Sequence, residues 1–283
     1  MGCRFEILID VDRSGLSRAE CAAVCEEMRE LVLDWHARLS VFEEGTIVSR
    51  FNRGRAGDAF VLDDDLFALC SLCDRLRLDT DGAFNIAAGT LMEAHGFRES
   101  VVDDLDGLSI DKGFVLDETQ RTITKTDGRI RIDFGGIAKG FVLDLIRNEL
   151  EELGITDAFV HGGTSSVMGM GRGWSAGVGD GMTATLEDLS LGVSETDSRV
   201  VDGSGHVMDP QTMAPATSSL QRVACVHKSA AAADAYATAC CVWPNLIERL
   251  GDGSCTLIVF DTESEPIAID PLGVVRPSPE DQE

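Results

Sequence analysis

Two segments in the first third of the chain carry hydrophobic residues at helical spacing. Ser17 stands three residues before Glu20, which is the pattern of a capping box at a helix start. The apolar positions that follow recur along one helical face, at Val24, Met28, Leu31, Trp35 and Leu39. A second helix is expected from Asp63 to about Leu78, because acidic side chains stabilise the first turn of a helix.

Short apolar runs between turn residues predict strands through the rest of the chain. The expected strands are Cys3 to Val11, Phe114 to Leu116, Arg121 to Thr124, Ile130 to Phe134, Ala158 to His161, Trp174 to Val178, Leu186 to Ser194, Arg222 to His227 and Thr256 to Phe260. Three more helices are expected, one ending near Leu153, one over Ala230 to Val242, and one from Pro244 to before Gly251. Strands and helices are mixed without regular alternation, which favours an α+β fold with a mostly antiparallel sheet and packed helices.

The length and composition suit one globular unit. The chain has 283 residues, of which 44% are hydrophobic, and no internal repeat or linker divides it. We therefore expect a single domain over residues 1–270. The last residues are polar and include Pro271, Pro277 and Pro279, which predicts a loose C-terminal tail over residues 271–283.

The net charge excludes some classes of partner. Lysine and arginine total 24 and aspartate and glutamate total 49, so the formal charge is −25. A protein this acidic repels phosphate backbones, so we expect no nucleic acid partner, although a local basic pocket for one small phosphate ligand stays compatible with it. No apolar run is long enough for a transmembrane segment.

The cysteines and the first residues bear on location. Nine cysteines is an odd number, and most lie within apolar runs, which favours buried thiols in a reducing compartment over a disulfide framework. No basic and then apolar signal peptide opens the sequence as given. We expect a cytoplasmic protein, or an exported or lipid-anchored one if an N-terminal leader is missing from this sequence.

A glycine-rich corner, Asp133 to Gly140 (DFGGIAKG), is the strongest local signal for chemistry. An expected strand ends in Asp133, two glycines allow a ligand to approach the backbone, and Lys139 falls in the first turn of the next helix. A helix N-terminus offers free N–H groups and the positive end of a dipole, which together bind phosphate. The alternative interpretation is a tight turn that only caps the helix.

The alanine-rich helix contains two oxygen ligands one turn apart. Asp234 and Thr238 are at i and i+4, so their side chains share one helical face. Carboxylate and hydroxyl oxygens suit Mg²⁺, which completes its octahedron with carbonyls, water and phosphate oxygens. Such a pair is also common on a solvated helix face, but here the neighbours are nearly all apolar, so the carboxylate needs a partner.

A histidine precedes an Asp-Pro turn in Gly205 to Pro210 (GHVMDP). The plain interpretation of this segment is a turn. If His206 reaches the same pocket as Lys139 and Asp234, it can act as a general base.

In this order, these pieces resemble the ApbE-type FAD:protein FMN transferases. The quoted matches are Met1 to Cys3 with the family's MGT, Ser40 to Asn52 with S-x-Y/F…S-x-x-S-R-x-N, Gly82 to Phe97 with G-A-F-D…G-P-L…W-G-F, Asp133 to Asp144 with D-x-G-G-I-A-K-G-x-x-x-D, Gly162-Gly163 with GG, His206 to Pro210 with H-I-I-D-P, and Ala233 to Thr238 with A-D-A-x-x-T. The likeness extends over about residues 1 to 260, and seven motifs in register make it specific.

The resemblance implies an ApbE-like, T-fold-related α+β domain and a Mg²⁺-dependent enzyme with FAD as substrate. Such an enzyme transfers FMN to a Thr or Ser hydroxyl of an acceptor protein and releases AMP. By the same resemblance, Gly136, Asp234 and Thr238 hold the metal and His206 is the catalytic base. The FAD site it implies comprises Met1, Phe42, Ala83, Phe84, Asn85, Asp133, Lys139 and Met208.

Several positions differ from the family pattern and leave other functions open. Asn85, Thr90 and His95 replace the family's Asp, Pro and Trp, and Ser194 to Asp197 stand where it has S-G-D-Y. A Mg²⁺-dependent FAD pyrophosphatase that yields FMN and AMP would use the same metal site with water as nucleophile. A diverged FAD-binding protein without catalysis is the third hypothesis.

Overall fold

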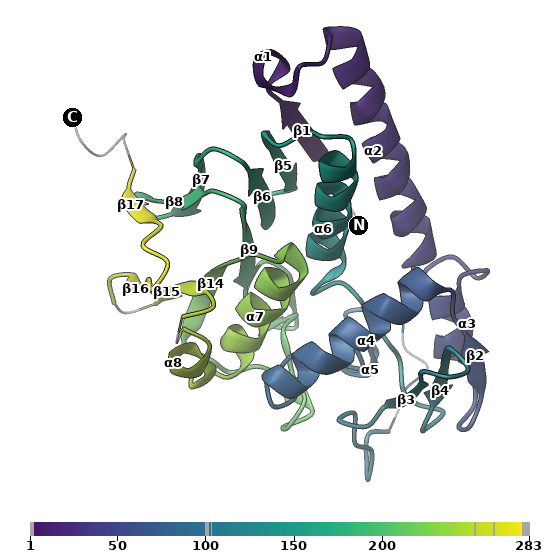
Figure 1. Cartoon of the computed structure of the whole chain (residues 1–283). Coiled ribbons are helices and arrows are strands. Elements are labelled where there is room, and N and C mark those ends of the chain that lie inside the picture. The colour runs from purple at the N-terminus through teal and green to yellow at the C-terminus, as the bar shows by residue number, and fades with distance from the viewer. Residues whose placement is uncertain (1–2, 100–101, 103, 252, 263, 279–283) are drawn as a thin grey trace.

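The fold is built on one seven-stranded antiparallel sheet (Figure 1). The computed structural model describes residues 3–99, 102, 104–251, 253–262 and 264–278. In sheet order the strands are β1 (Phe5–Ile9), β5 (Ala158–Gly162), β6 (Ser166–Met170), β9 (Leu189–Glu195), β14 (Leu220–His227), β15 (Thr256–Asp261) and β16 (Ile267–Ile269). Each neighbouring pair in this sheet is antiparallel, as the sequence predicts.

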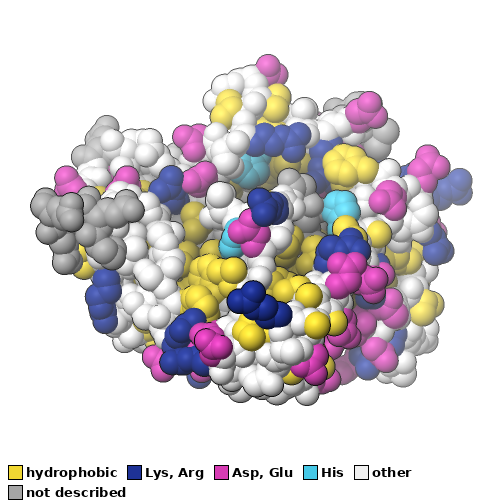
Figure 2. Space-filling view, turned by 90° about the horizontal axis from the view of Figure 1, so that it is seen from above, with side chains coloured by type: hydrophobic (Ala, Val, Ile, Leu, Met, Phe, Trp, Pro, Cys, Tyr) yellow, Lys and Arg dark blue, Asp and Glu magenta, His cyan; other side chains and the backbone are white. Residues whose placement is uncertain are grey.

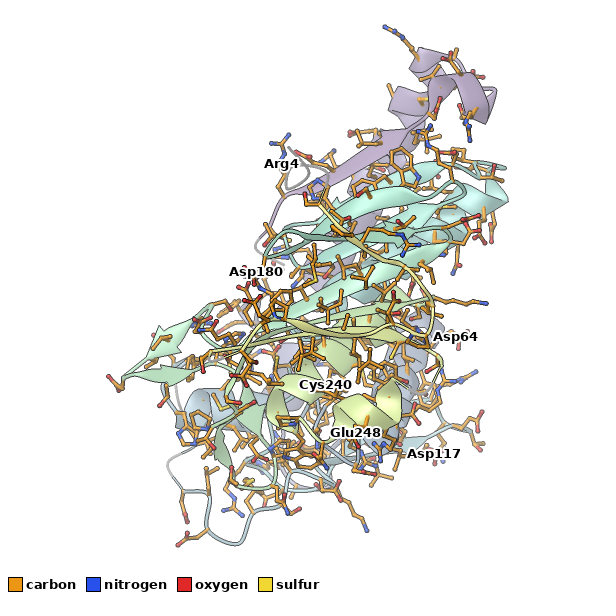
Figure 3. The ribbon with its side chains drawn as sticks, turned by 90° about the vertical axis from the view of Figure 1, so that its left-hand side faces the viewer. Arg4, Asp64, Asp117, Asp180, Cys240 and Glu248 are labelled. Atoms are coloured by element: carbon orange, nitrogen blue, oxygen red, sulfur yellow. The ribbon has the colours of Figure 1, made fainter. Side chains whose placement is uncertain are left out.

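Layers of different kinds bury the two faces of this sheet. Helices α2 (Arg18–Arg38), α6 (Ala138–Glu152) and α7 (Ala230–Val242) pack on one face, and Figure 3 shows Cys240 of α7 beneath the strands. A second sheet, β17-β8-β7, covers the other face, with β7 at Trp174–Gly179, β8 at Met182–Leu186 and β17 at Val275–Pro277. On β14, Val223 and Cys225 face the helices, whereas Ala224 and Val226 face the small sheet. Because both faces are buried there, the middle of this strand, residues 223–226, is a continuous apolar run.

A third group of elements lies beside the helical layer. It consists of α3 (Ile47–Arg53), α4 (Asp64–Asp79), α5 (Gly89–Ala94), and the sheet β2-β4-β3 formed by β2 (Ala59–Val61), β4 (Thr122–Lys125) and β3 (Phe114–Asp117). The short helix α1 (Val11–Ser14) follows β1, and α8 (Leu246–Leu250) packs against α7. Two short hairpins follow β9, namely β10 (Val200–Val201) with β11 (Ser204–Gly205), and β12 (Met208–Asp209) with β13 (Ala214–Pro215).

The predicted helices are confirmed, and their caps are as the sequence indicates. Ser17 Oγ accepts a hydrogen bond from the Glu20 amide at 3.3 Å, and the Glu20 carboxylate accepts one from the Ser17 amide at 2.8 Å. At α4, Asp63 accepts from the Leu66 amide at 2.9 Å. These signals are local in sequence, so they fix the helix starts without tertiary information.

Two predictions for irregular segments are wrong. Ile130 to Phe134 does not form a strand, since only Arg131 makes an isolated bridge, to Ala88. The tail is not loose where Val275–Pro277 pair with β8 as β17, while residues 279–283 lie outside the described part. The prolines favoured the prediction of a loose tail, but Pro277 at the end of an edge strand does not disrupt the pairing.

The glycines near residue 170 conceal strand β6, which the sequence does not predict. A Cβ atom on Gly169 would lie 2.7 Å from the carbonyl oxygen of Leu186, so glycine is needed where the two sheets approach. Glycines with this packing role look like turn residues in the sequence alone.

The thiols are distributed as the sequence predicts. Seven of the nine cysteines are buried, and the nine side chains are thiols rather than disulfides. Acidic and basic side chains are interspersed on the face in Figure 2, which suits a solvated surface. Every helix in the described ranges is too short or too polar to span a bilayer.

Candidate active site

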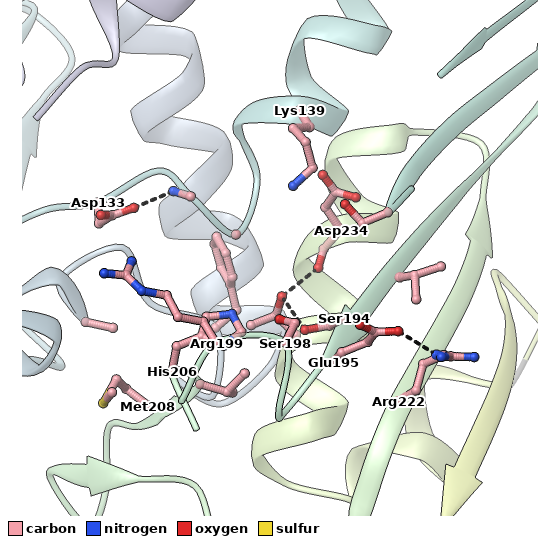
Figure 4. Close-up of a pocket in the computed structure, with 18 of the residues that line it drawn as sticks. Asp133, Lys139, Ser194, Glu195, Ser198, Arg199, His206, Met208, Arg222 and Asp234 are labelled. Carbon is pink, nitrogen blue, oxygen red and sulfur yellow. Dashed lines mark hydrogen bonds and ion pairs between the residues drawn. The ribbon is translucent and has the colours of Figure 1, made fainter. Parts of the chain in front are cut away.

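A cavity of about 620 Å³ lies where the helical layer meets the ends of the central strands (Figure 4). Its walls come from segments far apart in sequence, including the start of α6, one face of α7, the end of β9 and the hairpins after it. Ten of the predicted site residues line it: Ala83, Phe84, Asn85, Asp133, Gly136, Lys139, His206, Met208, Asp234 and Thr238. The fold therefore gathers most of the predicted set in one place.

The other two predicted site residues are Phe42 and Met1. Phe42 is 82% exposed, and its ring centroid is 5.6 Å from the guanidinium carbon of Arg98, which lines the cavity. Phe42 thus lies beside a cavity residue without being part of the wall. Met1 falls outside the described residues.

Close packing of α6 on α7 sets the upper wall. A Cβ on Gly140 would lie 2.1 Å from the Ala230 carbonyl oxygen, so only glycine allows this approach. Asp144, one turn later on α6, accepts hydrogen bonds from the Ala230 amide and the Ser229 hydroxyl, both at 2.7 Å. The start of α7 is therefore fixed against α6, which brings Lys139 and Asp234 to the same wall.

Three residues that carry candidate oxygen ligands lie on this wall, namely Gly136, Asp234 and Thr238. Asp234 and Thr238 lie one turn apart on α7, and the Thr238 hydroxyl is 3.6 Å from where a Cβ on Gly136 would lie. The hydroxyl donates to the Asp234 carbonyl at 3.0 Å, which leaves its lone pairs available. All three residues line the cavity.

Asp234 has an unusual environment for a carboxylate. It is 7% exposed, and its oxygens accept from the Ser166 hydroxyl at 2.8 Å and from the Gly140 amide at 2.8 Å. Burial raises its pKa to about 7, and the nearby positive charge of Lys139 opposes that rise. A buried carboxylate of this kind is stabilised as an anion when a cation binds beside it.

These residues fit a divalent cation such as Mg²⁺. Carboxylate, hydroxyl and main-chain carbonyl are hard oxygen donors, which Mg²⁺ prefers. In the part of the chain that is described, no group of three or more His, Cys, Asp or Glu side chains could hold a metal alone. A cation here would complete its shell with water and ligand phosphate oxygens, as Mg²⁺ commonly does.

The polar atoms of Asp133 and Asn85 are used mainly in contacts within the protein. Asp133 forms an ion pair with Arg98 and accepts from the Gly135 amide at 2.5 Å, which fixes the glycine corner. The Asn85 side chain donates to the Ile110 carbonyl at 3.0 Å and accepts from the Ala87 amide at 2.9 Å. Both side chains shape the wall by holding backbone.

His206 faces the cavity from the wall opposite α7 (Figure 4). Burial, and then the positive charge of Arg199, lower the pKa of its imidazole below the ordinary value of 6.5. Its Nδ1 atom is buried and has no hydrogen-bond partner among the described residues. A neutral imidazole with a free ring nitrogen can accept a proton from a bound ligand.

Several residues that line the cavity were not predicted from the sequence. They are mainly cationic or hydroxyl-bearing: Arg98, Arg199, Arg222, Glu195, Thr164, Ser165 and Ser194. Glu195 and Arg222 form an ion pair at 2.8 Å, and the Ser194 and Thr238 hydroxyls are 3.5 Å apart. Ser194 and Glu195 fall in the segment that departs from S-G-D-Y, which is the one signal that pointed to this wall.

In this α+β fold, one cavity joins oxygen-bearing side chains of α7, a lysine and a histidine with a lowered pKa. A lysine at the start of a helix is suited to a phosphate-bearing ligand. The chain belongs to the ApbE family, whose family model matches residues 1–250. The resemblance stated from the motifs is thereby confirmed.

Individual relatives agree with this assignment. The chain is 28% identical over 279 residues to a protein of Rhodobacter capsulatus named FAD:protein FMN transferase, covering 87% of this chain and 52% of that protein. It therefore spans about half the length of that relative. A Treponema pallidum protein of the same name is 26% identical over 79% of this chain and 72% of its own.

Solved structures show the same fold. The apo form of Pseudomonas stutzeri flavinyl transferase ApbE superposes with a TM-score of 0.80 at 21% identity, covering 95% of this chain and 96% of that one. The flavin transferase ApbE from Vibrio cholerae gives a TM-score of 0.77 at 18% identity over 96% and 95%. The α+β architecture predicted from the sequence is confirmed.

Proposed function

We propose that this protein transfers FMN from FAD to a Thr or Ser hydroxyl of an acceptor protein and releases AMP, in a Mg²⁺-dependent reaction. The names of the relatives support the activity. The proposal rests on one observation: two walls with different chemical groups face each other across one cavity. One wall presents Gly136, Asp234, Thr238 and Lys139, and the other presents neutral His206.

Each wall has a separate chemical task. Asp234, Thr238 and the Gly136 carbonyl would hold Mg²⁺, which when bound neutralises the charge of the pyrophosphate oxygens. Lys139 adds a positive charge at the N-terminus of α6, where free amides also favour phosphate. This wall would therefore orient the FAD pyrophosphate for attack.

His206 would activate the acceptor. Its neutral imidazole takes the proton from the Thr or Ser hydroxyl while that oxygen bonds to the FMN phosphorus, and the bond to the bridging oxygen breaks. The electron pair of that bond leaves with AMP. The lowered pKa keeps His206 unprotonated, and thus able to act as a base, at neutral pH.

The test measures AMP release from FAD. We expect release to require Mg²⁺ and to stop with EDTA, and we expect a flavinylated product when an acceptor protein is added. AMP released at the same rate without acceptor would indicate a pyrophosphatase. FAD bound without any AMP release, with or without acceptor, would indicate a binding protein.

A further inference from the structure

Four lysine and arginine side chains line the cavity, and two of them are neutralised. Arg98 is paired with Asp133, and Arg222 is paired with Glu195 at 2.8 Å. Lys139 and Arg199 are different, because within the described residues neither has a carboxylate at ion-pair distance. Lys139 already has a place in the proposed reaction, whereas Arg199 does not.

Arg199 lies beside the proposed base. It follows the end of β9, and its positive charge lowers the pKa of both His206 and Arg98. Figure 4 shows Arg199 on the His206 side of the cavity, with Lys139 and Asp234 across from it. The two unneutralised cations thus lie on opposite walls.

The Arg199 guanidinium is partly anchored and still has donors to offer. One of its nitrogens donates to the Phe97 carbonyl, and its carbon lies 5.8 Å from the centre of the Phe97 ring. A guanidinium has five N–H donors in a planar fork that matches two oxygens of a phosphate. The hydrogen bond to Phe97 therefore restricts the position of the guanidinium and leaves other N–H groups to bind a ligand.

We propose that Arg199 binds the pyrophosphate of FAD from the wall opposite Lys139, and so contacts the group that His206 helps to cleave. This inference rests on the proposed function. A diphosphate needs local positive charge to enter a protein whose net charge is −25. Arg199 and Lys139 supply it from two sides, and Arg199 places it next to the attacked phosphorus.

Binding of ADP with Mg²⁺ tests this without catalysis. We expect Arg199→Gln to weaken ADP binding about tenfold or more in titration calorimetry, because a charge-assisted bidentate contact is lost. Adenosine, which lacks phosphate, should bind both proteins equally. Arg199→Lys should recover part of the affinity, because it keeps the charge but not the fork.

The control is Arg29→Gln, which removes the same charge from the exposed surface of α2, where Arg29 forms an ion pair with Glu26. It should bind ADP as the unaltered protein does. A second readout is the imidazole titration of His206 by NMR, where Arg199→Gln should raise the pKa while Lys139, which also lowers it, is unchanged.

The outcomes separate this inference from the proposed function. If the unaltered protein binds neither FAD nor ADP, the proposed function fails and the inference fails with it. If the unaltered protein binds both, but folded Arg199→Gln binds ADP as tightly as Arg29→Gln, only the role of Arg199 is overturned. A uniform loss of ADP and adenosine binding would also overturn it, because it would show a structural effect.

Discussion

Replacing Gly140 by alanine tests whether the contact between α6 and α7 builds the site. The added Cβ would lie 2.1 Å from the Ala230 carbonyl oxygen and 2.4 Å from its carbon. Ordinary van der Waals contact begins at 3.4 Å, so the helices must separate by roughly 1 Å. That movement would also lengthen the 2.8 Å hydrogen bond from the Gly140 amide to the Asp234 carboxylate.

The expected cost follows from these two effects. Overpacking costs about 1–3 kcal/mol, and a strained hydrogen bond to a buried charged group costs about 1.5–3 kcal/mol. We expect a loss of about 4 kcal/mol in the free energy of unfolding, which lowers Tm by roughly 10 °C in a chain of this size. Binding of Mg²⁺ with ADP should weaken as well, because Asp234 moves.

Gly45→Ala is the matched control, since its Cβ would meet nothing within 4 Å. Calorimetric or circular dichroism melts of both variants should show a large shift for Gly140→Ala and a change within about 1 kcal/mol for Gly45→Ala. If Gly140→Ala has the same Tm as the unaltered protein and the same affinity for ADP, the packing argument is wrong.

Three further predictions concern titratable side chains. Asp234→Asn should abolish the rise in Tm that Mg²⁺ and ADP produce. Without ligand, its stability near pH 7 should equal or exceed that of the unaltered protein, because the pKa of Asp234 is raised to about 7 and its ionisation therefore destabilises the folded protein as pH rises from about 4 to 7. A lower stability of ligand-free Asp234→Asn would count against this. The rate of AMP release should rise with pH through a pKa below 6.5 and then level off. His206→Gln should lower the rate at high pH at least a hundredfold and remove its rise with pH. If the rise with pH is unchanged in this variant, it belongs to another group. Lys125 is buried, and its pKa is lowered to about 7, so the folded protein binds fewer protons than the unfolded one between about pH 7 and 10.5. Relative to Lys125→Met, the unaltered protein should therefore gain about 1 kcal/mol of stability per pH unit in that window, measured by urea unfolding at pH 7 and 9; a pH-independent difference would show that Lys125 stays protonated.

Local signals explain what the sequence predicted well. The capping box at Ser17 and the acidic start at Asp63 act within one helical turn, and both helices begin there. Asp234 and Thr238 could be paired because the helical repeat alone puts them on one face. Their position beside Lys139 depends on the tertiary contact at Gly140, and the sequence alone gives no sign that this glycine makes such a contact.

Other features depend on packing that no local pattern shows. Gly169 resembles a turn residue, but it is in a strand where two sheets approach. Arg98 and Arg199 could not be chosen from 24 basic residues, because only the fold brings them to the cavity. Phe42 was placed by family resemblance, and the structure puts it next to Arg98, outside the cavity wall.

Release of AMP from FAD, measured with and without Mg²⁺ and an acceptor protein, tests the central claim most directly. The purified protein should release AMP only when Mg²⁺ is present, and should couple that release to covalent flavin on an acceptor hydroxyl. Asp234→Asn, run in parallel, should release none. AMP release that persists in EDTA or in Asp234→Asn would contradict the metal-dependent site described above.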